Sequence, residues 1–193
     1  MPKNRIAFPK SHAAKRSASR AFWNKVTMII ALMFMLGGAY IYSVYNDNRE
    51  IFIPSPGAAI RAADGDSFSV GAKKLRLRGI DAPERDQICV DENGKDWPCG
   101  LAAKAALARL LEQPNLTCEA GAYDRFGRAL AKCAVSEHSD IAANLVASGF
   151  AVSQEFNGIR DYSREEDRAR SAKRGIWRGT FTPPREWRDT HPR

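Results

Sequence analysis

Apolar positions divide the chain into one long uninterrupted run and a body of short alternating segments. Residues 26–45 read VTMIIALMFMLGGAYIYSVY and contain no charged residue. At about 1.5 Å per residue this run spans roughly 30 Å, the thickness of the hydrocarbon core of a bilayer. The pattern therefore predicts a transmembrane helix over 26–45. A cleaved signal segment, with Gly37-Gly38-Ala39 as the cleavage site, and a buried core helix are the alternatives.

The body predicts short strands separated by turns. AIRAAD and SFSV flank Gly65 in the manner of a hairpin, and KKLRLRGI alternates so that Leu75 and Leu77 face inward. LTCEA and ALAKCAV predict two more strands joined by a turn, and a loop precedes the helix that separates them from the first three. The five predicted strands cover residues 59–64, 67–70, 74–80, 116–120 and 128–135.

Three segments of the body have helical patterns. Residues 101–112 are rich in Ala and Leu and stop before Pro114, residues 140–148 end at Gly149, and the charged stretch 160–174 ends at Gly175. Five short strands with one helix between the third and the fourth fit an OB-type Greek-key barrel. We therefore predict a β-rich α+β fold: a five-stranded OB-type barrel with about three helices, preceded by one N-terminal transmembrane helix.

The charge distribution indicates on which side of a membrane each part of the chain is expected. The 193 residues include 30 Lys or Arg and 22 Asp or Glu, a net charge of +8. Residues 1–25 hold seven of the basic residues and no acid, which leaves 23 basic and 22 acidic residues for the rest. Such a nearly neutral body does not indicate a protein that coats nucleic acid through bulk charge. By the positive-inside rule, the N-terminus is expected in the cytoplasm and the body outside it.

These patterns give a linear organisation for the chain. The predicted parts are a basic cytoplasmic tail (1–25), a transmembrane anchor or signal segment (26–45), a linker with two prolines (46–57), a folded domain (58–188) and a short tail (189–193).

The four cysteines are consistent with an exported body. None forms a CxxC pair, so a zinc site is a poor fit, and an even count outside the cytoplasm suggests two disulfides. Three connectivities are possible. We favour the sequential one, Cys89–Cys99 and Cys118–Cys133, because the second pair would face each other across two adjacent antiparallel strands.

Two acidic motifs lie at predicted turns. Asp64-Gly65-Asp66 suits an ordinary hairpin, and Asp81-Ala82-Pro83-Glu84 suits a strand end before an extended X-Pro step. Oxygen ligands that converge would instead suit Ca²⁺, and Mg²⁺ is the alternative ion.

Basic residues and histidines narrow the chemistry further. Arg76 lies on an alternating strand and Arg128 opens another; a guanidinium matches phosphate oxygens in bidentate geometry, although a surface turn is the simpler reading of Arg128. The three histidines, His12, His138 and His191, are scattered, which makes a His-dependent triad, a His-rich zinc site and a two-histidine ribonuclease mechanism unlikely. Any catalysis would thus rest on carboxylates and arginines.

Five motifs in order resemble the staphylococcal-nuclease-like (thermonuclease) family, in particular its disulfide-bearing exported bacterial members. The resemblance covers about Ile60 to Arg188, and only the ordered set is specific. The motifs are Asp64-Gly65-Asp66-Ser67, Leu75-Arg76-Leu77-Arg78-Gly79-Ile80-Asp81-Ala82-Pro83-Glu84, Asp124-Arg125-Phe126-Gly127-Arg128, Leu145-Val146-Ala147-Ser148-Gly149-Phe150-Ala151 and Gly175-Ile176-Trp177.

The resemblance implies a Ca²⁺-dependent phosphodiesterase. By position, Asp66 and Asp81 would be metal carboxylates, and Ala82 would offer its backbone carbonyl where the family often has Thr. Glu84 would orient or deprotonate the attacking water.

The two arginines complete the implied site. Arg76 and Arg128 would hold the phosphate and stabilise the charge that develops in the transition state. The family cleaves DNA and RNA, prefers single strands or frayed duplex, and leaves 3′-phosphate ends. Membrane attachment through 26–45 is expected, and no protein partner is implied.

One departure concerns nucleotide contacts. In the best-known member two tyrosines follow the Gly-aliphatic-Ala motif and contact nucleotide, whereas this chain has Val152-Ser153-Gln154-Glu155-Phe156. Phe156 is the remaining candidate for stacking on a base. The alternative function is a non-catalytic OB-fold module that binds nucleic acid or another envelope polymer, and the intact set of acids and arginines speaks against it.

Overall fold

The computed structural model describes residues 12–47, 50–155 and 158–192. The chain separates into two compact units, Met1–Asp47 and Asn48–Arg193. The predicted linker at 46–57 crosses this boundary, and part of it is a strand, β1 (Glu50–Phe52), which pairs with β8 (Thr117–Tyr123).

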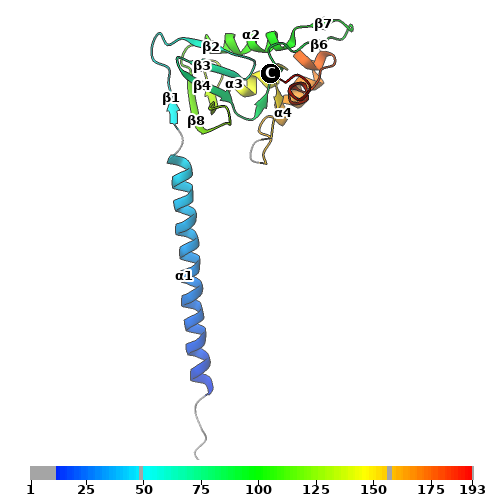
Figure 1. Ribbon diagram of the computed structural model, residues 1–193. Helices are drawn as coiled ribbons and strands as arrows, with labels where there is room; N and C mark the ends of the chain where they lie inside the picture. The colour runs from blue at the N-terminus through cyan, green and yellow to red at the C-terminus, as the bar shows by residue number, and fades with distance from the viewer. Residues whose placement is uncertain (1–11, 48–49, 156–157, 193) are drawn as a thin grey trace, which may run out of the picture. The chain divides into compact units, whose positions relative to one another are not determined.

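The first unit is one continuous helix, α1 (His12–Asp47) (Figure 1). Its segment Phe22–Ser43 has a mean hydropathy of 1.8 and no buried residues in its most apolar stretch, so it is long and apolar enough to cross a membrane. This segment overlaps the predicted span at 26–45. The helix also runs without interruption through Gly37-Gly38-Ala39, the alternative signal-cleavage site.

The second unit is built on a six-stranded sheet, accompanied by two small two-stranded sheets. Neighbouring strands are antiparallel except β4 and β9, which run parallel. Two further pairs form separate two-stranded sheets: β10 (Val152–Ser153) with β5 (Ile80–Asp81), and β6 (Cys89–Val90) with β7 (Asp96–Trp97). The order across the large sheet is β1, β8, β9 (Ala129–Ala134), β4 (Lys73–Leu77), β3 (Ser67–Val70) and β2 (Ile60–Ala62) (Figure 1).

The five predicted strands are all found, but closure of a barrel is not confirmed. Within the described residues, β1 and β2 are the two ends of the large sheet and no strand pairing joins them. The predicted strand 74–80 is interrupted after Leu77, because Gly79 has a φ of 77° and turns the chain into β5 (Ile80–Asp81). The fold is thus OB-type α+β. The turn at Gly79, between β4 and β5, lies directly before the second acidic motif.

Three predicted helices are present and a fourth was missed. They are α2 (Cys99–Leu111), α3 (Ile141–Ala147) and α4 (Ser163–Ser171), and Asp140 caps α3 by accepting a hydrogen bond from the Ala143 N–H (3.2 Å). The missed helix, α5 (Pro184–Thr190), begins with a proline in its first turn and follows the short 3₁₀ segment Gly175–Arg178. The predicted loop 81–100 also contains a small hairpin, β6 (Cys89–Val90) and β7 (Asp96–Trp97).

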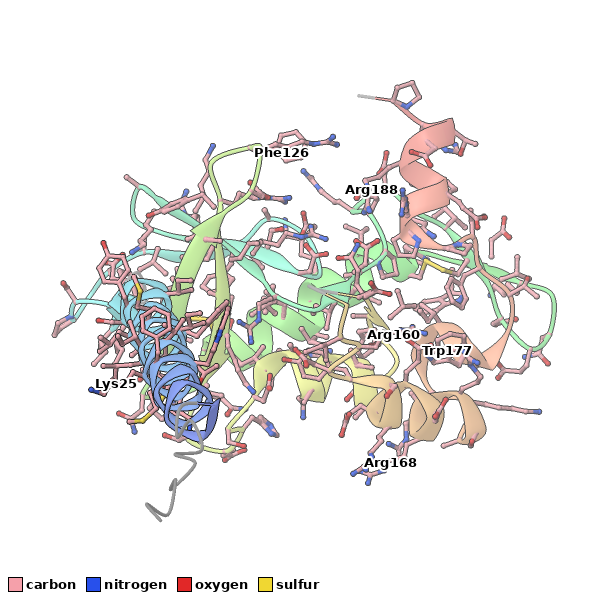
Figure 2. All side chains as sticks on the ribbon, turned by 90° about the horizontal axis from the view of Figure 1, so that it is seen from below. Lys25, Phe126, Arg160, Arg168, Trp177 and Arg188 are labelled. Carbon is pink, nitrogen blue, oxygen red and sulfur yellow. A yellow bond between two sulfur atoms is a disulfide. The ribbon has the colours of Figure 1, made fainter. Side chains whose placement is uncertain are left out.

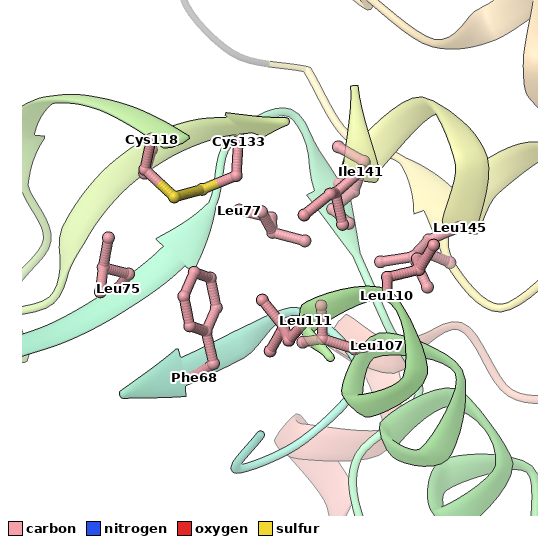
Figure 3. Close-up of a cluster of buried hydrophobic side chains, with 14 of the residues drawn as sticks. Phe68, Leu75, Leu77, Leu107, Leu110, Leu111, Cys118, Cys133, Ile141 and Leu145 are labelled. Atoms are coloured by element: carbon pink, nitrogen blue, oxygen red, sulfur yellow. A yellow bond between two sulfur atoms is a disulfide. The ribbon is translucent and has the colours of Figure 1, made fainter. Parts of the chain in front are cut away.

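The main core fills the space between the large sheet and helices α2 and α3 (Figure 3). Leu75 and Leu77 point inward, as the alternation predicted, and are at most 1% exposed. Cys118 and Cys133 lie opposite each other on β8 and β9 and form a disulfide with a Cα–Cα distance of 4.1 Å. The strand pairing therefore positions this bond, as the sequential connectivity required.

A second, smaller core lies around the other disulfide. Cys89 and Cys99 are bonded, both are at most 1% exposed, and Ile176 packs with them. Half-buried side chains from the C-terminal part, including Trp177 and Phe181, cover this cluster. This disulfide thus links the loop after the second acidic motif to the start of α2, and it packs against the segment that leads into α5.

Candidate active site

A cleft of about 780 Å³ opens between the large sheet and α5. Its floor includes Glu84 and Asp86. On one side the helix wall consists of Trp187, Arg188 and His191. On the other the sheet wall consists of Asp64, Lys74, Arg76, Asp124, Arg125, Phe126, Arg128 and Leu130. Figure 2 shows Phe126 on the turn between β8 and β9 and Arg188 on α5, the two elements that face each other across the cleft.

The turn at Asp64-Gly65-Asp66 is held by its own first carboxylate. Oδ1 of Asp64 accepts hydrogen bonds from the backbone N–H groups of Asp66 (3.0 Å) and Ser67 (2.7 Å). A Cβ at Gly65 would lie 2.7 Å from the Cβ atoms of Ala82 and Ala103, so only glycine allows this close packing on α2. The motif therefore forms an ordinary turn and also contributes to the candidate site, because the turn fixes the direction of the Asp66 side chain.

Arg76 joins the two acidic motifs. Its Nη1 donates to Oδ1 of Asp66 (2.7 Å) and its Nη2 donates to Oδ1 of Asp81 (2.9 Å). Both carboxylate side chains are at most 4% exposed and the guanidinium is 14% exposed. Burial opposes the charged form of Arg76, but the two carboxylates outweigh it and raise its pKa. The two acids thus lie within the width of one guanidinium.

Asp66 contacts Arg76 of the cleft and has a strongly perturbed carboxyl. Burial raises its pKa to about 7, although Arg76 lowers it, and the nearby Asp64 and Asp81 add to the rise. Its Oδ2 also accepts a hydrogen bond from the backbone N–H of Ala82 (3.1 Å). A positive charge beside this carboxyl would favour its ionised form.

Arg128 lies on the same side of the cleft and has different partners. Its Nε donates to Oδ2 of Asp124 (2.7 Å) and its Nη1 donates to Oγ of Ser67 (3.0 Å). Partial burial opposes ionisation of Asp124, but hydrogen bonds from the backbone and side chain of Arg128 and from the Phe126 N–H lower its pKa. Since Ser67 in turn donates to Asp66 (2.7 Å), the two arginines belong to one hydrogen-bonded network.

A buried glutamine, Gln87, holds the backbone of the second acidic motif in place. The backbone N–H of Glu84 donates to Oε1 of Gln87 (3.1 Å), and Nε2 of Gln87 donates to the carbonyl of Thr182 (2.7 Å). Gln87 has no exposed surface. A Cβ at Gly100 would collide with the backbone carbonyl of Glu84, so the start of α2 also packs against this motif. The position of Glu84 consequently depends on the C-terminal segment.

Arg188 was not predicted as a site residue. It donates three hydrogen bonds to carboxylates of the second acidic motif. Its Nη1 donates to Oδ1 of Asp81 (2.9 Å) and Oε1 of Glu84 (2.9 Å), and its Nη2 donates to Oδ2 of Asp81 (2.8 Å). These hydrogen bonds raise the pKa of Arg188, led by those to Asp81. The sequence offered one local signal, the Pro183-Pro184 helix start, and no signal for partners more than a hundred residues away.

The structure brings the predicted site residues of the sheet and its following loop together. Asp66, Asp81 and Arg76 are in direct contact, Ala82 contacts Asp66, and Glu84 joins them through Arg188. Arg128 reaches the group through Ser67. The predicted stacking residue, Phe156, lies outside the described residues.

The donor set for a cation is small. Within the residues that the structure describes, no three His, Cys, Asp or Glu side chains form a group that could hold a metal ion. Asp66 and Asp81 supply two carboxylates, and both are held by Arg76. Hard oxygen donors of this kind fit Ca²⁺ or Mg²⁺, with backbone carbonyl and water completing the shell.

OB-type folds bind oligonucleotides or oligosaccharides, and this one presents acids and arginines at one cleft. The model of the family described as staphylococcal nuclease homologue matches residues 74–179, more than half of the chain, and the protein belongs to this family. The matched region contains Arg76, Asp81, Glu84 and Arg128. Asp66 precedes it and Arg188 follows it.

One similar protein is the succinoglycan biosynthesis protein ExoI of Rhizobium meliloti (strain 1021). The two chains are 34% identical over 116 residues, which are 60% of this chain and 61% of that protein. The matched part therefore spans less than two thirds of the relative.

Proposed function

We propose that the protein is a phosphodiesterase that hydrolyses DNA or RNA, preferably single-stranded. The observation that carries this proposal is the network in which Arg76 holds Asp66 and Asp81 beside Arg128 and Glu84, in the cleft of a staphylococcal-nuclease-like domain. A phosphodiester is an anion, so attack by water is opposed electrostatically. Paired guanidiniums in a half-buried cleft offset that opposition.

Different residues of the site have different roles in the proposed hydrolysis. Arg76 and Arg128 bind the phosphate oxygens and stabilise the additional negative charge of the transition state. Glu84 accepts a proton from the attacking water as its oxygen bonds to phosphorus. The bond from phosphorus to the 5′ oxygen breaks, and the leaving 5′ oxygen takes up a proton from solvent. The products are a 3′-phosphate and a 5′-hydroxyl.

We propose Ca²⁺ as the resident cation, with Mg²⁺ as the alternative. Asp66, Asp81 and the backbone carbonyl of Ala82 would hold it, and when bound it neutralises charge on the phosphate. Arg188 contacts both Asp81 and Glu84, so its guanidinium orients these carboxylates from the helix wall.

The test is cleavage by the full chain, purified in detergent under oxidising conditions. Labelled single-stranded DNA and RNA are incubated with Ca²⁺, with Mg²⁺ or with chelator, and the ends of the products are analysed. Glu84→Gln is expected to lose at least about a hundredfold in rate, because the proton acceptor is gone. The exposed Glu137, outside the cleft, provides the matched control Glu137→Gln, which should cleave like the parent chain.

Cation-dependent cleavage that collapses in Glu84→Gln supports the proposal. A folded, disulfide-bonded chain that cuts neither substrate under any of these conditions contradicts it. Cleavage that survives Glu84→Gln unchanged would contradict the assigned role of Glu84.

A second candidate function is a non-catalytic module that binds nucleic acid or another envelope polymer. The observation that favours it is the name of the relative, which refers to succinoglycan biosynthesis. Binding of nucleic acid or of an anionic polysaccharide, without cutting, would move this candidate ahead of the first.

We further propose that residues 26–45 anchor the protein in a membrane, with the N-terminus in the cytoplasm and the nuclease-like domain outside. The exposed apolar segment Phe22–Ser43, the basic residues before it and the two disulfides support this topology. Protease added to intact spheroplasts should digest the domain and leave the tail. A domain that is protected there, or that is released into the medium with a new N-terminus near Ala39, would contradict an anchor of this orientation.

A further inference from the structure

The helix wall of the cleft carries aromatic rings as well as Arg188. The rings of Trp187 and His191 are stacked, with centroids 3.8 Å apart and planes only 7° from parallel. Both residues line the cleft that contains Arg76 and Arg128. The stack is one helical turn long, because the His191 N–H donates to the carbonyl of Trp187 (2.9 Å).

This stack has a fixed place relative to the predicted phosphate site. Arg188, the neighbour of Trp187, is bonded to Asp81 and Glu84 by three hydrogen bonds of 2.8–2.9 Å. The segment before the helix is held by the bond from buried Gln87 to the Thr182 carbonyl. Pro184, at the start of α5, is buried as well. The aromatic pair is thus anchored to the same carboxylates on which hydrolysis would depend.

The chemistry of the stack matches one class of ligand. A nucleobase lies one sugar away from its phosphate and has a flat π face, and unpaired bases bind proteins by stacking on aromatic side chains. Arg188 cannot replace this contact while its terminal nitrogens are bonded to carboxylates. Phe126, on the opposite wall, already has the guanidiniums of Arg125 and Arg128 within 4.8 and 5.3 Å of its ring centroid.

We infer that Trp187 and His191 form a subsite for one unpaired nucleobase, next to the phosphate that the cleft arginines hold. This inference rests on the proposed function and extends it, because the pair lies beyond residues 74–179, where the family match ends. The subsite takes the base of DNA or RNA, and a base in an intact duplex cannot reach it without leaving its own stack.

The test measures binding rather than cleavage. The full chain carrying Glu84→Gln, in detergent with Ca²⁺, is titrated against a labelled single-stranded oligothymidylate and against an abasic oligonucleotide of the same length. Adding Trp187→Ala should weaken binding of the normal oligonucleotide about tenfold. The same change should leave binding of the abasic oligonucleotide almost unaltered, while Trp187→Phe should retain most of the affinity.

Two further variants complete the design. Tyr123→Ala removes an aromatic ring that is 64% exposed and does not line the cleft, and it should bind both oligonucleotides like the parent. His191→Ala changes an exposed residue at the end of α5, so it tests the subsite even if Trp187→Ala folds poorly. It should weaken binding of the normal oligonucleotide only, and by less.

The outcomes separate the two levels of inference. Suppose that the Glu84→Gln chain binds the normal oligonucleotide and that the unmodified chain cuts it. If adding Trp187→Ala then leaves binding as tight as before, the subsite is wrong and the proposed function stands. An equal loss for normal and abasic oligonucleotides would also overturn the subsite, since the base would not be the contact. If the chain neither binds nor cuts either nucleic acid, the proposed function fails and the subsite fails with it.

Discussion

The two walls of the cleft are built in different ways. The sheet wall takes Arg76 from β4, which is paired on both sides, and Arg128 from the residue directly before β9. The helix wall takes Arg188 from a seven-residue helix, and Arg188 is held at the site by side-chain hydrogen bonds to Asp81 and Glu84. Arg76 is 14% exposed, whereas Arg188 is 36% exposed.

The two walls combine stability and proposed function in different ways. On the sheet wall a charge is buried between two acids, so the same residue serves the fold and the proposed chemistry. On the helix wall the contacts are more exposed to water, so they orient carboxylates with less effect on folding. Mutations should therefore harm stability more from the sheet side than from the helix side.

The largest effect is expected from Arg76→Gln. The change leaves Asp66 without its guanidinium in a buried position, and breaking such a pair costs about 3–5 kcal/mol. Denaturant unfolding in chelator measures the loss. Lys74→Gln, on the same strand but exposed, is the control and should change stability by less than about 0.5 kcal/mol. Equal losses for the two variants would show that the buried pair does not stabilise the sheet wall.

The next effect is expected from removing one disulfide. A bond that closes a short loop stabilises by about 2–4 kcal/mol, so Cys89→Ala with Cys99→Ala should lower the free energy of unfolding by that order. Hydrogen exchange of the backbone amides shows which segments lose protection. Amides of residues 176–190 should exchange faster, because the disulfide packs against Ile176.

The paired control for that change is Cys118→Ala with Cys133→Ala. It should accelerate exchange in β8 and β9 and leave α5 protected, because this disulfide lies under the large sheet. If either double variant loosened both walls equally, the two walls would not be separate units of stability.

A smaller effect on stability is expected from Arg188→Gln. Three charged hydrogen bonds are lost, but the side chain is partly exposed, so the cost should be about 1–2 kcal/mol. Cleavage should fall more than stability does, because Asp81 and Glu84 lose the group that orients them. A cost in stability that matches Arg76→Gln would abolish the contrast between the walls.

The smallest effect concerns Asp124, which holds Arg128. The pKa of Asp124 is lowered in the folded state, so its contribution to stability is present above the unfolded pKa of about 4 and is lost as the pH falls through the lower folded value. Asp124→Asn should therefore be less stable than the parent by under about 1 kcal/mol at pH 7. Unfolding curves from pH 7 to 2.5 should converge in acid; a difference that grows in acid would reverse the assigned sign.

The sequence was most informative where function and local structure share the same residues. Alternation predicted the inward positions of Leu75 and Leu77, and the facing cysteines predicted the pairing of β8 with β9. The family resemblance grouped the acidic and arginine motifs into one site, and the structure places Asp66, Arg76 and Asp81 in direct contact. The closed barrel went further than the observed pairings, because local patterns do not specify which sheet edges meet.

The helix wall could not be predicted in the same way. Arg188 resembles any surface arginine in sequence, and its partners Asp81 and Glu84 are 107 and 104 positions away. Gln87 likewise has an ordinary sequence context, although it is fully buried and joins Glu84 to Thr182. Long-range hydrogen bonds of this kind depend on the completed packing, which no local period records.

The order of these elements along the chain also has a consequence in time. Synthesis proceeds from the N-terminus, so a nascent chain that ends just before Thr182 already contains the sheet wall but still lacks Arg188 and Trp187. Gln87 then has no carbonyl to receive its Nε2 hydrogen bond, and the Glu84 loop is not yet anchored. Assembly of the cleft is consequently a late step, which follows translation of α5 rather than accompanying the growth of the sheet.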